Sequence, residues 1–199
     1  MKKGNYLNFI SKSALAGILI ALAGAIYLNS PNKIIGALLF SVGLISVILT
    51  ESNLYTGKIG YVHDRSTCVD AVFMLTINLV SAFLVGLIYR GSFGTTSAMN
   101  SRLAQTWYQL LLNGVGCGAL IYLAVELYKK TKSLIPVILG VMAFILAGFE
   151  HCIADAFYYG ASELTWKGLG CIGLVIVGNT IGSLLIRFLQ TGFEFKAKL

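Results

Sequence analysis

The sequence predicts an all-α integral membrane protein, and three observations support this fold class. The 199 residues are 57% hydrophobic and only 12% charged, and their mean hydropathy is +0.81. Six apolar segments follow one another along the chain, several of them near the length that crosses ~30 Å of hydrocarbon. Polar residues interrupt the end of two of these segments. Soluble domains do not have this composition, so we expect one transmembrane domain over residues 1–199.

The order of the segments also predicts an orientation in the membrane. The segments are expected at about Ser13–Asn29, Ile34–Thr50, Cys68–Tyr89, Gln105–Tyr128, Leu134–Phe149 and Gly168–Leu189. The first is long and lacks a signal-peptide exit, so we interpret it as a membrane span. Six spans put both termini on one side, which carries eleven of the fifteen lysines and arginines. The positive-inside rule therefore predicts a multi-pass protein of the inner (plasma) membrane with cytoplasmic termini.

Charge and cysteine content narrow the function classes. The positive-inside rule accounts for most of the net charge of +7. We therefore expect no nucleic-acid partner. The four cysteines lie in or beside apolar segments without a Cys-x-x-Cys pair, which is typical of small buried side chains. We expect no metal, no cofactor and no catalytic residues, and the chain leaves no room for a soluble catalytic module.

The two polar breaks predict where an internal pathway lies. Glu51–Thr56 ends the second apolar segment and Glu150–Asp155 ends the fifth, 99 residues later. Charged residues at membrane depth are costly and normally face a pathway or site, and irregular backbone survives there only in protein or beside water. Asn78 and Asn179 are separated by a similar 101 residues. These offsets predict an inverted 3+3 repeat, about 10–92 and 102–192, in which helices 2 and 5 are broken.

Three motifs at these positions resemble those of the formate/nitrite transporter family. The stretch Ala147-Gly-Phe-Glu-His-Cys-Ile-Ala154 nearly matches the family signature [AS]-G-F-E-H-S-[IV]-A-N, and Asp155 stands where Asn is usual. Leu54-Tyr-Thr56 resembles the family's L-F-T loop of the broken second helix. Gly178-Asn-Thr-Ile-Gly182 is similar to its G-N-x-[IV]-G motif in helix six. Order and spacing agree, and the resemblance covers nearly all of the chain.

The resemblance implies a homopentamer of aquaporin-like protomers in the lipid bilayer, each conducting small monovalent anions such as formate, nitrite or hydrosulfide. By this resemblance His151 is the central pore histidine, Thr56 faces it and Asn179 lies near it. Arg102 falls where the family usually has a lysine, at the outer start of helix four. The apolar constrictions on either side of the histidine fall at Phe40, Leu44, Leu54 and Phe144.

The remaining polar residues are expected to support the broken helices. Glu150 and its counterpart Glu51 are interpreted as partners of backbone N–H groups at the breaks. Asp155 is expected to pair with a basic residue or to be protonated. Gly118 occupies a place where many family members carry Asn, which would remove one polar pore contact.

The expected chemistry is the passage of a weak acid through an apolar constriction. A bare anion is expensive to bury unpaired, whereas a basic residue at the entrance attracts it and His151 can give it a hydrogen bond or a proton. The sequence leaves open a passive channel and a proton-coupled symporter. Two other classes also remain: an aquaporin-like pore for neutral solutes, although its Asn-Pro-Ala boxes are absent, and a membrane enzyme or electron carrier. Haem ligation by paired histidines inside spans is disfavoured because only His151 qualifies.

Overall fold

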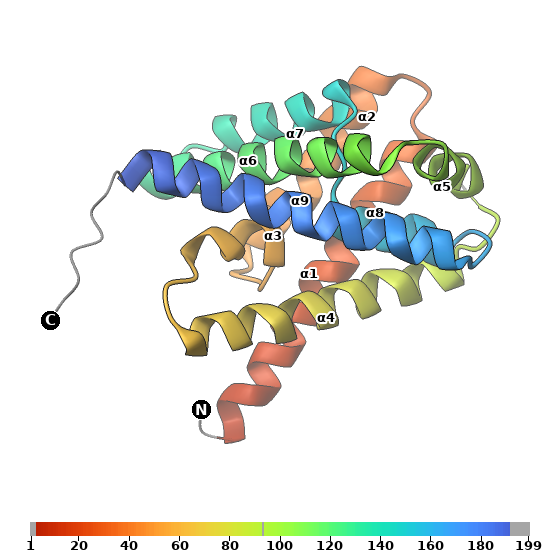
Figure 1. Ribbon diagram of the computed structural model, residues 1–199. Coiled ribbons are helices and arrows are strands. Elements are labelled where there is room, and N and C mark those ends of the chain that lie inside the picture. Colours follow the sequence, from red (N-terminus) through yellow and green to blue (C-terminus); the bar gives the residue numbers. More distant parts are fainter. Residues whose placement is uncertain (1–2, 93, 192–199) are drawn as a thin grey trace, which may run out of the picture.

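Every regular element that the computed structural model describes, over residues 3–92 and 94–191, is a helix (Figure 1). The elements are α1 (Lys3–Asn29), α2 (Lys33–Leu49), α3 (Tyr55–Lys58), the 3-10 helix η1 (Ile59–Tyr61), α4 (Arg65–Ile88), α5 (Thr95–Leu103), α6 (Trp107–Thr131), α7 (Ile135–Ala147), α8 (Cys152–Gly160) and α9 (Trp166–Thr191). The predicted all-α fold class is confirmed.

Helix length and hydropathy identify the candidate membrane spans. Within α1, α4, α6 and α9 the structure has four helices that are long and apolar enough to cross a membrane. α7 and α8 meet the same criterion only together, and they are bent by 58° relative to each other. α2 is apolar but has only 17 residues. This gives four spans, or five with the bent pair, so the six-span arrangement stays a prediction.

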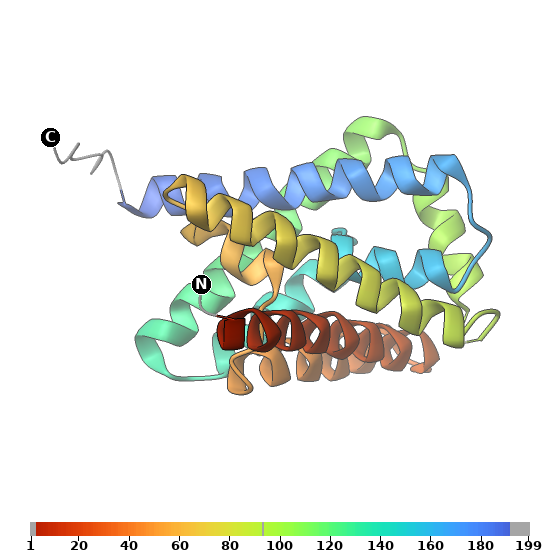
Figure 2. The ribbon, with the colours of Figure 1, turned by 90° about the horizontal axis from the view of Figure 1, so that it is seen from below.

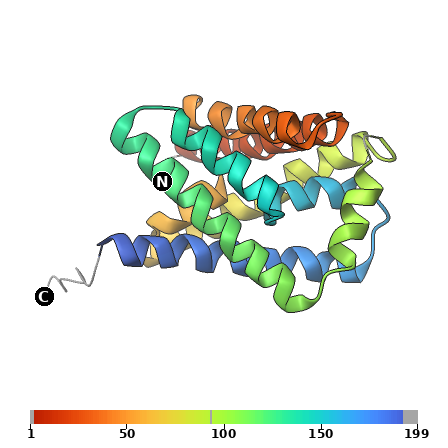
Figure 3. The same ribbon diagram turned by 90° about the horizontal axis from the view of Figure 1, so that it is seen from above.

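The helices run between two ends of the molecule. α1 begins and α9 ends at one end, where the connection between α6 and α7 also lies, and α5 lies at the opposite end (Figures 2 and 3). α1 packs along α2 and α4, and α6 packs along α9. This places the short helices α3 and α8 in the interior, whereas α2 and α7 each expose apolar side chains on one face.

Two boundaries differ from the sequence-based expectation. α1 starts at Lys3, well before the expected Ser13, because the hydroxyl of Ser13 bonds to the carbonyl of Phe9 inside the helix and does not cap it. α5 was not predicted, since its sequence is polar and follows Gly94, whose φ of 65° reverses the chain. Arg102 therefore lies on this separate short helix and not at the start of the next span, which begins at Trp107.

The breaks use backbone conformations that end a helix abruptly. α7 ends at Gly148, whose φ of 77° is the left-handed conformation that glycine adopts without a steric penalty. The chain then passes through His151, the N-cap residue of α8. α2 ends before Glu51, which has a φ of 52° although it carries a side chain. α3 begins four residues later, at Tyr55.

A fully buried asparagine of α4 holds the break between α2 and α3. The side-chain oxygen of Asn78 accepts a hydrogen bond from the backbone N–H of Tyr55 at 2.8 Å. Its amide nitrogen donates to the carbonyls of Asn53 and Ser13 at 2.9 and 2.7 Å. One side chain thus satisfies backbone groups that the broken helix leaves without partners.

Asn179 of α9 does the same for the second break. Its oxygen accepts from the backbone N–H of Cys152 at 3.0 Å, and its nitrogen donates to the carbonyls of Glu150 and Gly114, both at 2.9 Å. This side chain is also fully buried. The two asparagines therefore make corresponding sets of three bonds. Each set ties a break to α1 or α6 and to the first residue of the short helix that follows the break.

Glycines bring α6 and α9 into close contact at the second break. The Gly114-x-x-x-Gly118 and Gly178-x-x-x-Gly182 pairs face each other across these helices. A Cβ at Gly118 would overlap the backbone of Asn179, including its carbonyl oxygen. The absence of a side chain at Gly118 is therefore required by helix packing here.

We expect Gly118→Ala to destabilise the protein by about 1–3 kcal/mol, because the added methyl must push two backbones apart. The measurement is the thermal unfolding midpoint of the purified protein in detergent. Gly173→Ala, on the same helix pair but with open space around its position, is the control and should leave the midpoint unchanged or slightly raised. Equal midpoints for the two variants would contradict this packing argument.

Candidate functional site

The two breaks meet at His151 and Thr56. Thr56 lies in α3, and His151 precedes α8, where the chain leaves the break. The Thr56 hydroxyl and His151 Nε2 are 2.9 Å apart, and both side chains are buried. The other ring nitrogen, Nδ1, accepts a hydrogen bond from the backbone N–H of Ala154 at 3.3 Å. The structure thus brings together the two residues that the motifs place at the centre of the pathway.

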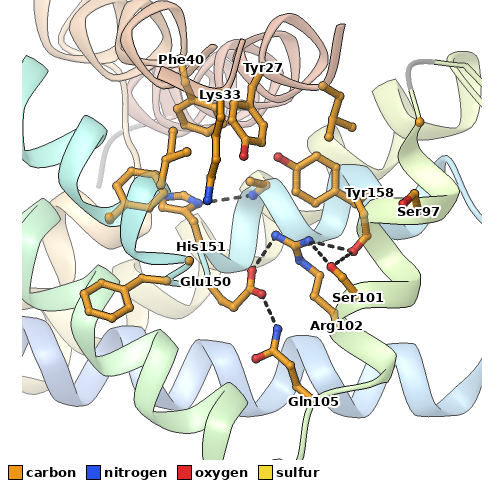
Figure 4. A pocket seen from close by; sticks show the side chains of 18 residues that line it. Tyr27, Lys33, Phe40, Ser97, Ser101, Arg102, Gln105, Glu150, His151 and Tyr158 are labelled. Atoms are coloured by element: carbon orange, nitrogen blue, oxygen red, sulfur yellow. Dashed lines mark hydrogen bonds and ion pairs between the residues drawn. The ribbon is translucent and has the colours of Figure 1, made fainter. Parts of the chain in front are cut away.

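A cavity of about 550 Å³, here called the α5 pocket, reaches His151 from the end of the molecule where α5 lies. Its wall includes His151, Phe40 and Phe144, and Lys33 and Arg102 add basic side chains. Figure 4 shows the Lys33 and Arg102 side chains entering it from different elements. The pocket therefore combines charged side chains with two phenylalanines and the central histidine.

A second cavity of about 360 Å³, here called the lysine pocket, opens at the other end of the molecule. Its wall contains Lys58, Lys129 and Lys132. Leu44 and Leu54 also line it. Both cavities thus combine basic side chains with apolar ones, and they approach the interior from opposite ends.

Four buried apolar residues flank the histidine–threonine pair, two on the side of each cavity. Phe40 and Phe144 meet edge to face, with ring centroids 5.8 Å apart, and line the α5 pocket. Leu44 and Leu54 line the lysine pocket. Phe144 also lies against His151, with ring centroids 6.1 Å apart. The residues expected to form the constrictions thus lie on the expected sides of the histidine, and their pore role stays a prediction.

Arg102 forms a buried ionic cluster at the edge of the α5 pocket. Its Nη2 lies 2.6 Å from Glu150 Oε2, and its Nε donates a hydrogen bond to Asp155 Oδ1. The side chains of Arg102, Glu150 and Asp155 are 15%, 5% and 2% exposed. The guanidinium also lies over the ring of Tyr158, 4.6 Å from its centroid. One cation therefore contacts two carboxylates, and the second oxygen of Asp155 has no hydrogen-bond partner in the described residues.

Glu150 is held from its other side by a chain of amides. Gln105 Nε2 donates to Glu150 Oε1 at 2.7 Å, and Asn113 Nδ2 donates to Gln105 Oε1 at 2.9 Å (Figure 4 shows the first of these bonds). Glu150 was expected to satisfy backbone N–H groups at the break. In the structure its carboxylate instead bonds to side chains of α5 and the connection after it, because Asn179 already serves the backbone there.

Two other predicted residues, Asn179 and Glu51, do not contact the histidine–threonine pair, although Glu51 lines the lysine pocket. Asn179 is fully buried behind the second break, with its amide used by three backbone groups, and it does not line either pocket. Glu51 has an 85% exposed side chain that pairs with Lys12 at 3.5 Å. The expectation that Glu51 satisfies backbone N–H groups at its break is therefore wrong, because its carboxylate points to the surface and pairs with a lysine.

Sequence reasoning missed the lysines of both pockets. Lys33, Lys58 and Lys129 were counted only as orientation signals, although each lines a cavity. The distribution of lysines and arginines could have indicated Lys33, since it is one of only four basic residues on the side predicted to be outside. Gln105 and Tyr158 were missed because nothing in their local sequence indicates contact with Glu150 or Arg102.

Comparisons with known proteins agree on one family. The family model described as "Formate/nitrite transporter" matches residues 2–191. An uncharacterized transporter of Bacillus subtilis, YrhG, is 29% identical over 182 residues, covering 77% of this chain and 68% of its own length. A solved structure titled "FNT family ion channel" has a TM-score of 0.84 at 22% identity and covers 94% of this chain and 90% of that one. Another, titled "Pentameric formate channel with formate bound", has a TM-score of 0.80 at 20% identity, with coverage of 96% and 98%.

Proposed function

The chain belongs to the formate/nitrite transporter family, and from that premise we propose that it conducts small monovalent anions of weak acids, such as formate, nitrite and hydrosulfide, across the plasma membrane. The observation that carries the proposal is the buried His151–Thr56 pair between two basic cavities that approach from opposite ends. Basic side chains in both cavities suit an anion. The formate-bound solved structure with the same fold favours formate as the first substrate to test.

The hydrogen bonds of His151 determine what it can offer an anion. Because Nδ1 accepts from Ala154 N–H, the neutral ring carries its proton on Nε2 and donates it to the Thr56 hydroxyl. The threonine hydroxyl then has its own proton free to donate to an anion between the constrictions. Thr56 would thus be the direct donor, and His151 the group that orients it and can supply a proton through it.

The apolar residues on either side decide which species crosses. Phe40 with Phe144, and Leu44 with Leu54, offer no polar partner to a bare anion, which is costly to desolvate. A weak acid that takes up a proton near the His151–Thr56 pair crosses as a neutral molecule. Proton-coupled transport is therefore the proposed mode.

We also propose the assembly that this mechanism requires. The corresponding bonds of Asn78 and Asn179 support an inverted repeat of about 10–92 and 102–192, with six spans and with helices 2 and 5 broken. Both termini are cytoplasmic in this proposal, and each subunit of a homopentamer has its own pathway.

Uptake by proteoliposomes tests the proposal. We expect His151→Phe and Thr56→Val to lower formate uptake by about 10- to 100-fold, since each removes a hydrogen bond worth about 1.5–3 kcal/mol to a charged group. The panel includes nitrite and hydrosulfide at two pH values, and proton coupling predicts faster uptake at the lower one.

Thr76→Val is the matched control, because its exposed hydroxyl bonds only within its own helix. Glycerol and water swelling on the same vesicles addresses the alternative of a pore for neutral solutes. Formate uptake that is unchanged in His151→Phe would contradict the proposed role, and glycerol permeation without anion flux would favour the alternative.

A further inference from the structure

The charges around the α5 pocket do not match a simple account in which Arg102 attracts the anion. The Arg102 guanidinium is within ion-pair or hydrogen-bond distance of Glu150 and Asp155, both nearly fully buried. With both carboxylates ionised, this cluster carries a formal charge of −1. An approaching anion therefore meets a neutral or negative group at Arg102, although Arg102 is basic.

We infer that Lys33 is the residue that makes the α5 pocket attractive to anions; this inference rests on the proposed anion conduction. Lys33 is the first residue of α2, and its exposed side chain lines the pocket. Figure 4 shows it entering from the side of Tyr27 and Phe40, across the pocket from Arg102. Within residues 3–92 and 94–191 no carboxylate pairs with its ammonium group.

Lys33 offsets the net negative charge of the cluster around Arg102. Lys33, Arg102, Glu150 and Asp155 together are formally neutral, and without Lys33 they carry a charge of −1. A unit charge about 7 Å away in water changes the local concentration of a monovalent ion about threefold, and low-dielectric walls increase this effect. The loss of Lys33 therefore changes a pocket that accepts anions into one that repels them.

The position of Lys33 indicates that it affects the entry of an anion into the pocket and not its passage through the constrictions. It lies at the exposed rim, whereas Phe40, Phe144 and His151 form the floor. A change at Lys33 should therefore alter the anion concentration needed for half-maximal flux and leave the maximal flux unchanged. Lys167, another basic residue on the sparsely charged side, is exposed at the start of α9 and does not line the pocket, which makes it a matched control.

The first measurement is formate uptake by proteoliposomes as a function of concentration. At about 0.01 M ionic strength, where the Debye length is ~30 Å, we expect Lys33→Gln to raise the half-saturating concentration about three- to tenfold. The difference should disappear near 1 M salt, where charges are screened over ~3 Å. Lys33→Arg and Lys167→Gln should behave like the wild type. A half-saturating concentration that is unchanged in Lys33→Gln, or raised equally by Lys167→Gln, would overturn the inference.

The second measurement reads the charge of the pocket without any flux. A cysteine introduced by Ser97→Cys, on the pocket wall, is reacted with anionic and cationic methanethiosulfonate reagents in a Cys68→Ser background, which removes the exposed native thiol. We expect Lys33→Gln to lower the ratio of anionic to cationic reaction rates about three- to tenfold. An unchanged ratio refutes the inference, whereas a lowered ratio in vesicles that conduct no anion supports it and contradicts only the proposed function.

Discussion

Arg102→Gln is expected to destabilise the folded protein by about 3–5 kcal/mol, the cost of leaving buried charge without its partner. Glu150 and Asp155 are 5% and 2% exposed and share this one guanidinium. Without it, two carboxylates would face each other at membrane depth. The measurement is the thermal unfolding midpoint in detergent, together with the fraction of protein that elutes as a single species.

Two further variants test whether the loss of stability comes from the Arg102–Glu150–Asp155 cluster. Arg90→Gln removes an exposed arginine from the same side of the molecule and should change the midpoint little. Combining Arg102→Gln with Glu150→Gln and Asp155→Asn removes all three charges and should recover most of the lost stability. If Arg102→Gln unfolds at the same temperature as Arg90→Gln, the two carboxylates do not depend on Arg102.

Asn179→Leu is expected to have an effect of similar size on the second break. Leucine fills much of the same volume, but three buried backbone groups lose their partner. Each unsatisfied group costs about 1–3 kcal/mol, so the midpoint should fall strongly. The thiol of Cys152, which follows the break and is fully buried, should become reactive to maleimide, as peptide mapping would show.

Asn78→Leu should produce a comparable loss, because Asn78 makes the corresponding bonds at the first break. Val177→Leu, on the exposed face of α9 and close to Asn179, controls for the presence of a leucine. An unfolding midpoint for Asn179→Leu equal to that of Val177→Leu would mean that water or neighbouring groups replace the amide. The breaks would then not depend on these asparagines.

Local sequence was enough to find the central contact of the site but not its electrostatic surroundings. The motifs at Thr56 and His151 lie 95 residues apart, and the structure joins them by a hydrogen bond. The pairing of Arg102 with Asp155 and Glu150 depends on how α5 docks against α8, which no periodic pattern encodes. The two glutamates at the breaks look equivalent in sequence, yet only Glu150 is buried.

The missed elements have a common physical cause. α5 is short and polar, so neither hydropathy nor helical periodicity indicates it. The packing role of Gly118 could not be predicted either, because it depends on how closely α9 approaches. From the sequence alone, glycine at this position indicated only the loss of a polar side chain. The apolar segments, in contrast, predict α4, α6 and α9 to within a few residues, whereas α1 starts ten residues before its apolar segment.

The dependence of the second break on Asn179 has a consequence for how the protein is made. Asn179 lies 27 residues after Cys152 in the sequence, so the ribosome synthesises the break well before the side chain that secures it. The backbone groups of Cys152, Glu150 and Gly114 that bond to Asn179 therefore lack this partner until α9 is made. Biogenesis of the central site is thus a late event, and chains that stall before α9 should be recognised by membrane quality control.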